Sequence, residues 1–226
     1  MKTEFTSLGA VVVAAGTSRR MGGVNKLFAS VRGKPVVSWS VDTCERCSLV
    51  QQIVLVLNDS DLARGQSLKE RRGWSKVTLC SGGARRQDSV KAGLERVHNC
   101  KLVMIHDGAR PFLTLDMIDR GLEAARNVGA AIAAVPIKDT VKVVANGQLV
   151  RETLPRHRLW AAQTPQIFRF DMIARAYENL VAEITDDAAA VELSGNTVQL
   201  YMGDYRNIKV TTVEDLAVAR VIARSM

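Results

Sequence analysis

A stretch of small and basic residues follows the first apolar run of the chain. Residues 14–26 read AAGTSRRMGGVNK and contain three glycines and three cations, Arg19, Arg20 and Lys26, but no acid. Glycine-rich main chain can present N–H groups to phosphate oxygens, and the cations can neutralise several phosphate charges. The stretch matches neither the G-x-x-x-x-G-K-[ST] nor the G-x-G-x-x-G phosphate-binding pattern. It therefore favours a triphosphate site of another kind, with a solvated basic loop as the alternative.

Three further polar stretches follow apolar runs: SGGARRQDS at 81–89, HDGARP at 106–111 and IKDT at 137–140. Ligands of open α/β sheets bind at the carboxyl ends of the strands, so we expect these stretches and residues 14–26 to form one site. Asp107 can hold a Mg²⁺ ion shared with a triphosphate, because Mg²⁺ prefers oxygen ligands. The alternative for Asp107 is a loop cap bonded to nearby N–H groups.

The elements that would position these stretches alternate along the chain. Helical patterns lie at 85–97, at 114–127 after a possible N-cap, Thr114, and at 211–225 after a Thr211-x-x-Glu214 capping box. Short apolar runs, mostly continuous as in strands covered on both faces, lie at 10–15, 52–57, 76–80, 102–106, 130–137 and 198–203. The alternation predicts a single α/β domain over residues 1–226, with a doubly wound, mostly parallel, Rossmann-like sheet.

Residues 139–154 interrupt this alternation. They form two β-rich stretches around Asn146-Gly147, a strong hairpin signal. A lone two-stranded hairpin is marginally stable and needs a surface to pack on. We therefore expect a protruding β-arm at about 138–156 that lies across a second subunit of a homodimer. The alternative is an arm that packs on its own domain.

Composition limits the partners of the chain. The 226 residues carry a net charge of +8, are 47% hydrophobic, and include no apolar tract approaching the length of about 20 residues that a membrane span needs. The positive charge favours anionic partners, but there is no long Lys/Arg block and only 5% of residues are aromatic. We therefore expect no nucleic-acid surface and no membrane contact.

The chain also lacks signs of export or of cysteine chemistry. Its beginning, MKTEFTSLGA, has neither a long apolar segment nor a signal-type cleavage site, which predicts a cytoplasmic protein. Cys44 and Cys47 form a C-x-x-C pattern, but no second ligand pair or thioredoxin-like context accompanies it. We expect them, with Cys80 and Cys100, to be reduced structural thiols.

The motifs together carry a resemblance. A-A-G-x-x-x-R-M followed by Lys26 resembles the signature of the sugar-phosphate nucleotidyltransferases. With GGARRQDSV, HDGARP, KDTVK, TPQIF, TDDAAAVE and NIKVT in order, residues 9–224 are similar to the 2-C-methyl-D-erythritol 4-phosphate cytidylyltransferase family. The resemblance implies a nucleotidyltransferase sheet and a reaction of CTP with the polyol phosphate that releases pyrophosphate, in non-mevalonate isoprenoid synthesis. Such a reaction needs charge neutralisation and alignment, since the phosphate nucleophile is already anionic.

The resemblance also assigns roles on the CTP side. Arg20 and Lys26 would stabilise the transition state beside the phosphates, and Asp107 would bind Mg²⁺. Small residues and one serine would surround the base and ribose: Ala14, Ala15, Gly16, Gly82, Gly83 and Ser89.

A second set is implied for the polyol phosphate. Arg156 and Lys209 would hold the attacking phosphate. The whole set matched to this substrate is Arg110, Thr140, Arg156, Thr164, Thr185 and Lys209. Because several of these lie on or beside the predicted arm, each site is expected to be completed by the other subunit. Two other functions stay open: a ribitol 5-phosphate cytidylyltransferase, and a noncatalytic protein that binds nucleotide or nucleic acid.

Overall fold

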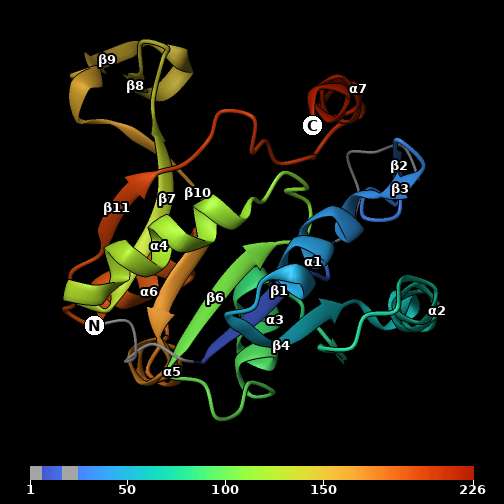
Figure 1. The fold of residues 1–226 in the computed structure, drawn as a ribbon. Helices are drawn as coiled ribbons and strands as arrows, with labels where there is room; N and C mark the ends of the chain where they lie inside the picture. Colours follow the sequence, from blue (N-terminus) through green and yellow to red (C-terminus); the bar gives the residue numbers. More distant parts are fainter. Residues whose placement is uncertain (1–6, 17–24) are drawn as a thin grey trace.

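The computed structural model describes residues 7–16 and 25–226. Within these residues, a seven-stranded sheet in the order β11-β7-β10-β6-β1-β4-β5 is covered by helices on both faces (Figure 1). Its strands are β1 (Leu8–Ala14), β4 (Val50–Leu57), β5 (Val77–Ser81), β6 (Leu102–Asp107), β7 (Ala130–Pro136), β10 (Trp160–Arg169) and β11 (Gln199–Met202). The helices are α1 (Val36–Arg46), α2 (Leu62–Arg72), α3 (Arg86–Leu94), α4 (Leu115–Val128), α5 (Phe170–Glu178), α6 (Asp187–Leu193) and α7 (Val213–Ile222).

The sheet confirms the predicted mostly parallel α/β class. All six expected strands are present, and β1 pairs in parallel with β4 and β6, β4 with β5, and β7 with β11. The carboxyl ends of β1, β4, β5 and β6 consequently meet at one edge. The loops that the sequence singled out all begin at the carboxyl ends of strands.

The sequence analysis missed one strand, β10. It lies between β6 and β7 and is antiparallel to both. Its TPQIF motif contains Pro165, and a proline normally counts against a strand inside a sheet. The Thr164-Pro165 peptide is cis, and the pairing with β7 shifts register between Ala162 and Gln166, which accommodates the proline.

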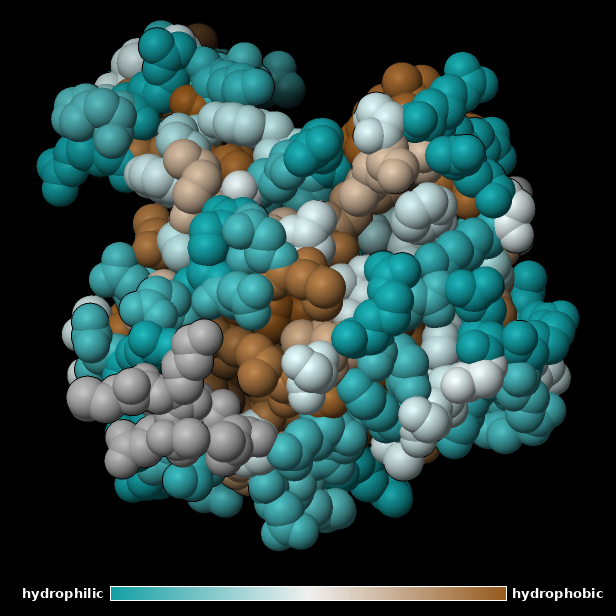
Figure 2. All heavy atoms as spheres, viewed as in Figure 1, coloured by the Kyte–Doolittle hydropathy of each residue, from teal (hydrophilic) through white to brown (hydrophobic). Residues whose placement is uncertain are grey.

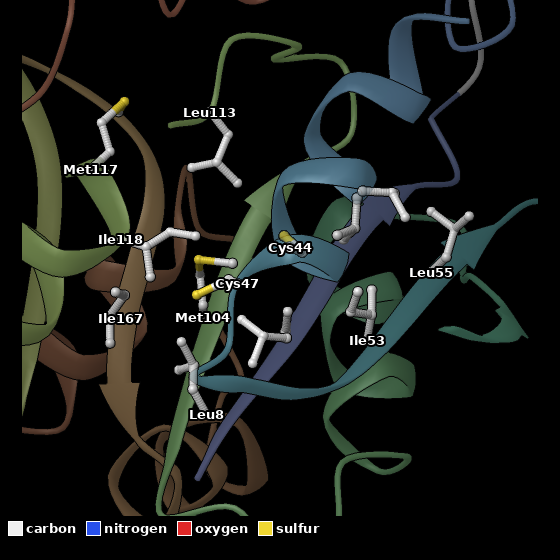
Figure 3. Packing of buried hydrophobic residues seen from close by; sticks show 14 of the residues in the cluster. Leu8, Cys44, Cys47, Ile53, Leu55, Met104, Leu113, Met117, Ile118 and Ile167 are labelled. Atoms are coloured by element: carbon white, nitrogen blue, oxygen red, sulfur yellow. The ribbon is translucent and has the colours of Figure 1, made fainter. Parts of the chain in front are cut away.

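Burial on both faces explains the continuous apolar runs. Along β1, Ala10 and Val12 pack with α1, α2 and α4, whereas Val11 packs on the other face with α3, α5 and α6. Figure 3 shows the first of these clusters, in which Cys44 and Cys47 lie against the sheet. Both thiols are buried and unbonded, and burial raises the pKa of Cys44. Their burial in the core agrees with the predicted structural role.

Helix starts were predicted with mixed success. Thr114 caps α4, since its hydroxyl accepts from the N–H of Met117. At α7 the predicted capping box is wrong by one residue: the hydroxyl of Thr212 accepts from Asp215 N, and the Asp215 carboxylate accepts from Thr212 N. The sequence TTVED offers two threonines and two acids, and the neighbouring Thr211 also donates to Asp215.

The predicted hairpin is present. It consists of β8 (Lys142–Val144), the turn η3 (Asn146–Gln148) and β9 (Val150–Thr153), with Gly147 at a φ of 70°. It projects from the body, and Figure 2 shows a notch between it and the lobe that carries α7. Every residue of β9 is exposed, so this strand does not pack on its own domain.

Shorter elements complete the described chain: β2 (Ser30–Val31), β3 (Lys34–Pro35) and the 3₁₀ turns η2 (Asp59–Asp61), η4 (Arg156–Arg158) and η5 (Ala223–Ser225). Among the described residues, no helix combines the length and apolar character needed to span a bilayer.

Candidate active site

The loops at the carboxyl ends of β1, β4, β5 and β6 enclose a pocket of about 520 Å³. Eight predicted site residues line it: Ala14, Ala15, Gly16, Lys26, Gly83, Ser89, Asp107 and Lys209. The structure therefore brings together most of the residues predicted for the CTP side, and one predicted for the second phosphate.

The two glycines after β5 allow a close approach of main chain. A Cβ on Gly82 would lie 2.3 Å from the Cβ of Ala15, and one on Gly83 would lie 2.3 Å from the Cβ of Asp88. A larger residue at Gly82 would push the β1 and β5 loops apart, and one at Gly83 would push the β5 loop away from α3. The pocket wall here is consequently backbone, which suits recognition of a flat base by main-chain groups.

Ser89 holds this wall in place. Its hydroxyl accepts from the N–H of Gly83 at 3.1 Å and lies 3.2 Å from the Arg85 carbonyl oxygen, to which it can donate. The side chain is almost fully buried. Ser89 thus lines the pocket, but its hydroxyl bonds to the main chain of the loop and stabilises the loop conformation.

Asp107, at the end of β6, is surrounded by cations. Its Oδ1 accepts from Arg86 Nε at 3.1 Å, and its Oδ2 lies 2.9 Å from Lys209 Nζ and 3.5 Å from Arg110 Nε. Burial would raise the pKa of Asp107, but the charges of Arg86, Lys209 and Arg110 outweigh it and hold the pKa well below its usual range. The carboxylate is therefore ionised throughout the neutral range.

Lys209 reaches this carboxylate from a distant part of the sequence. The segment before α7 runs beside the loop after β6, where the N–H of Val210 donates to the carbonyl oxygen of Ala109 at 2.8 Å. Arg110 Nη1 donates to the carbonyl oxygen of Asn207 in the same segment at 2.8 Å. These bonds hold two residues predicted for the polyol phosphate, Arg110 and Lys209, near the same oxygen of Asp107, Oδ2.

Sequence reasoning missed Arg86. Besides contacting Asp107, it forms a two-pronged pair with the fully buried carboxylate of Asp187, at 3.0 and 2.8 Å. Tyr177 donates to the same carboxylate at 2.6 Å. The motif GGARRQDSV contains two adjacent arginines, and only their positions at the start of α3 separate the inward Arg86 from the exposed Arg85.

A buried chain of hydrogen bonds supports Asp107 from behind. The Arg110 carbonyl oxygen can only accept, so Nε2 of His106, 2.9 Å away, carries the proton. Nδ1 then accepts from the hydroxyl of Thr164 at 3.0 Å, and this hydroxyl accepts from the N–H of Asp107 at 3.0 Å. Thr164, predicted to contact the polyol, has its hydroxyl engaged in positioning Asp107.

The remaining predicted residues lie outside the pocket lining. Thr140 and Thr185 are exposed, and Arg156, at the base of the hairpin, donates to the carbonyl oxygen of Lys138 at 2.6 Å. Arg20 falls outside the described residues. The described chain assembles the CTP side more fully than the polyol side.

The donor set around Asp107 fits a hard cation. Among the described residues, no three His, Cys, Asp or Glu side chains gather as a metal cluster. One ionised carboxylate at the pocket wall suits Mg²⁺, which is often held by one or two carboxylates together with substrate phosphates. Asp107 could serve in this way once an incoming phosphate engages Lys209.

The charge of the lining indicates what the pocket binds. Four cations, Lys26, Arg85, Arg86 and Lys209, face it with a single carboxylate, Asp107, among the described lining residues. Three of these cations pair with carboxylates: Arg85 with Asp88, Arg86 with Asp107 and Asp187, and Lys209 with Asp107. Incoming phosphates can take the place of such partners, so the lining can neutralise a polyphosphate and a second phosphate brought beside it. No nucleophilic side chain is needed for transfer between two phosphates.

Comparison with known proteins agrees with this chemistry. The family model for 2-C-methyl-D-erythritol 4-phosphate cytidylyltransferase matches residues 8–225. Relatives of that name from Dehalococcoides mccartyi and Alkaliphilus metalliredigens are 46% and 43% identical, and the matches cover 96% and 94% of this chain and 96% and 91% of theirs. The crystal structure of 4-diphosphocytidyl-2C-methyl-D-erythritol synthase from Anaerococcus prevotii superposes with a TM-score of 0.87 at 29% identity, covering 98% of this chain and 100% of the other.

Proposed function

The chain belongs to the 2-C-methyl-D-erythritol 4-phosphate cytidylyltransferase family and is a nucleotidyltransferase, and we propose that it joins CTP and 2-C-methyl-D-erythritol 4-phosphate. The products are 4-diphosphocytidyl-2-C-methyl-D-erythritol and pyrophosphate. The observation that carries the proposal is the pocket at the carboxyl edge of the sheet, with four cations, one carboxylate and a glycine-built wall. Those features match a nucleoside triphosphate and an anionic acceptor.

The reaction is a single displacement at phosphorus. A phosphate oxygen of the polyol phosphate forms a bond to the α-phosphorus of CTP, while the bond from that phosphorus to the bridging oxygen of the β-phosphate breaks. Pyrophosphate leaves with the electron pair. The nucleophile is already ionised near neutral pH, so no general base is required, and the protein contributes alignment and charge.

The described residues divide these tasks. Gly83 and the main chain at Ala15 receive the cytosine and ribose. Gly82 lies outside the pocket lining and lets the β5 loop approach Ala15. Lys26 neutralises charge on the triphosphate, as does Arg20 in the part of the loop that lies outside the described residues. Lys209 stands beside Asp107 where the second phosphate must approach, 2.9 Å from its carboxylate.

Mg²⁺ would be held by Asp107 together with the phosphates of CTP. When bound, it supplies additional positive charge and orients the triphosphate. Arg86, Lys209 and Arg110 keep the Asp107 carboxylate ionised, and the chain from His106 through Thr164 holds the main chain of Asp107 in place.

The hairpin would complete the polyol side in a homodimer. Its apolar side chains are exposed: Val144 by 59%, Leu149 by 71% and Val150 by 60%. Arg156 and Thr140 stand at its base, away from the pocket lining of their own subunit. A partner subunit would cover the apolar surface and receive Arg156 beside its own Lys209.

We place the reaction in the cytoplasm. The support is the state of two cysteines. Cys44 and Cys47 lie close in sequence and are buried, but they form no disulfide, as is usual for proteins of a reducing compartment.

Pyrophosphate release by the purified protein tests the reaction. We expect release with CTP, Mg²⁺ and 2-C-methyl-D-erythritol 4-phosphate, and none with ribitol 5-phosphate. Lys26→Ala should lower kcat/KM by about 100- to 1,000-fold, because it removes charge where the transition state gains it. The matched control is Lys91→Ala, which removes an exposed lysine from α3. Release with ribitol 5-phosphate alone would reassign the acceptor, and silence with both would contradict the proposal.

A further inference from the structure

The residue before Lys26 is tied to a distant carboxylate. Asn25 Nδ2 donates to Asp61 Oδ2 at 2.8 Å, and Asn58 Nδ2 donates to the same oxygen at 2.9 Å. Asp61 is buried, with 7% of its surface exposed. The three side chains thus join the end of the phosphate-binding loop to the turn after β4.

The orientation of both amides follows from their partners. A carboxylate oxygen only accepts, so the amide nitrogens must face Asp61. The amide oxygens are then also satisfied: Asn25 Oδ1 accepts from Leu27 N at 3.1 Å, and Asn58 Oδ1 accepts from Asp61 N at 3.1 Å. Both oxygen and nitrogen of each amide therefore take part in the contact.

The carboxylate of Asp61 is not needed to cap a helix. Asp61 is the last residue of the turn η2, which runs directly into α2, and its backbone is helical. The start of this helical segment is capped by Asn58, whose side chain accepts from the N–H of Asp61. The Asp61 side chain makes no capping bond to α2 and accepts from the two asparagines.

Lys26 is held on its other side as well. Leu27 is buried in the core, and its carbonyl oxygen accepts from the N–H of Val37 in α1 at 3.0 Å. The main chain of Lys26 therefore lies between a residue fixed by Asp61 and a residue fixed by the core. Lys26 itself faces the pocket beside Asn58.

We propose that Asn25, Asn58 and Asp61, together called the Asn25 clamp, are positioning residues that set the place of Lys26 for transfer. The inference rests on the proposed function. It adds a role for hydrogen bonds that join protein side chains to one another and not to substrate. Misplacing a charged group by about 1 Å can cost a transfer reaction about 100-fold in rate. Binding of the base and ribose depends on the separate β5 wall, so the clamp should affect turnover more than CTP affinity.

Kinetics of clamp variants of the full chain test this inference. Asn25→Ala and Asp61→Leu should each lower kcat by about 10- to 100-fold, while the Kd of CTP measured by calorimetry changes by less than about threefold. The loss of kcat in the double variant should be no larger than the loss in the more damaging single variant, because both substitutions remove the same link. Asp61→Asn should recover most of the activity lost in Asp61→Leu, since an amide oxygen can still accept from both asparagines.

Asp59→Asn is the matched control. Asp59 is an exposed carboxylate two residues from Asp61 in the same turn, so this change removes an equal charge and leaves the clamp intact. Wild-type kcat in Asn25→Ala, additive losses in the double variant, or a CTP affinity that falls as far as kcat would overturn the inference.

Hydrogen exchange separates this inference from the reaction itself. In Asn25→Ala the amide of Leu27 loses its acceptor, and its exchange should speed up by about tenfold or more. Asn25→Ala lies in a loop, so this readout does not depend on whether Asp61→Leu folds. If the wild-type protein released no pyrophosphate, the proposed function would fail, whereas unchanged exchange at Leu27 would overturn the clamp alone.

Discussion

At the scale of single residues, the neutral imidazole of His106 makes stability sensitive to acid. Burial lowers the pKa of His106 to about 4, against about 6.5 for an unfolded histidine. Because the folded value is depressed, the neutral ring stabilises the fold fully above about pH 6.5. This contribution is lost as the pH falls towards 4, since the unfolded chain takes up a proton that the folded chain excludes. Integrated over that range, the loss is about 3 kcal/mol.

Urea unfolding at pH 7 and at pH 4.5 measures this effect. His106→Asn should be less stable than the wild type at pH 7, because Thr164 and the Arg110 carbonyl lose their ring partner. Its stability should fall less between the two pH values than that of the wild type. His98→Asn, which removes an exposed ring, should keep the wild-type slope. Equal slopes for the wild type and His106→Asn would contradict the assignment.

At the scale of elements, Arg86 connects helix α3 to helix α6 and both to the end of β6. Arg86→Gln would leave the carboxylate of Asp187 buried with only the hydroxyl of Tyr177 as a side-chain donor. We expect the free energy of unfolding to fall by about 3 kcal/mol, the low end for a broken buried ion pair. Arg85→Gln, which removes a solvent-exposed pair with Asp88, should change the free energy of unfolding far less.

Denaturant unfolding of these two neighbouring variants makes the comparison. A similar small loss in both would mean that the inward pair with Asp187 does not stabilise the link between the helices. A large loss in Arg86→Gln with an unchanged m-value would support it.

The elements that the sequence reveals are those whose pattern depends on burial alone. Strands β1, β4, β6 and β7 are continuous apolar runs because both of their faces are buried, and the hairpin carries its own Asn-Gly turn. The sequence did not predict strand β10, because Pro165 interrupts its local pattern. Its strand conformation depends on pairing with β6 and β7, which are distant in sequence. The cap of α7 was misplaced by one residue because TTVED supports two registers equally well.

The site divides in the same way. Residues 14–16, Gly83 and Asp107 could be found because each lies at or just after the carboxyl end of a strand, and Lys26 because it ends the basic loop. The family resemblance supplied Lys209, whose nearness to Asp107 depends on a segment about 100 residues away. Arg86, Asp187 and the Asn25 clamp could not be found, because their roles come from tertiary contacts between ordinary polar residues.

At the scale of the whole molecule, shared sites in a homodimer can be tested by mixing inactive variants. Lys26→Ala and Arg156→Ala damage opposite sides of the proposed site. If Arg156 acts across the interface, a mixed dimer contains one site with both side chains intact. Random exchange of subunits should then restore about a quarter of the wild-type activity.

The assay is pyrophosphate release before and after the two inactive proteins are mixed at equal concentration. The control is a mixture of the Lys26→Ala variant with the double variant Lys26→Ala,Arg156→Ala. It should stay inactive, because every subunit lacks Lys26. A mass equal to one subunit by light scattering at the assay concentration, or no recovery despite subunit exchange, would contradict the shared site.

The position of β10 between β6 and β7 also affects how the sheet can form while the chain is being synthesised. The parallel strands β1, β4, β5 and β6 are complete once residue 107 has left the ribosome, and they can pair with one another. The outer edge of β6 has no native partner until residues 166–169 emerge, and β7 reaches the rest of the sheet only through β10. Over those 60 or so residues of synthesis, the nascent chain presents an unpaired, apolar strand edge, the kind of surface that chaperones protect.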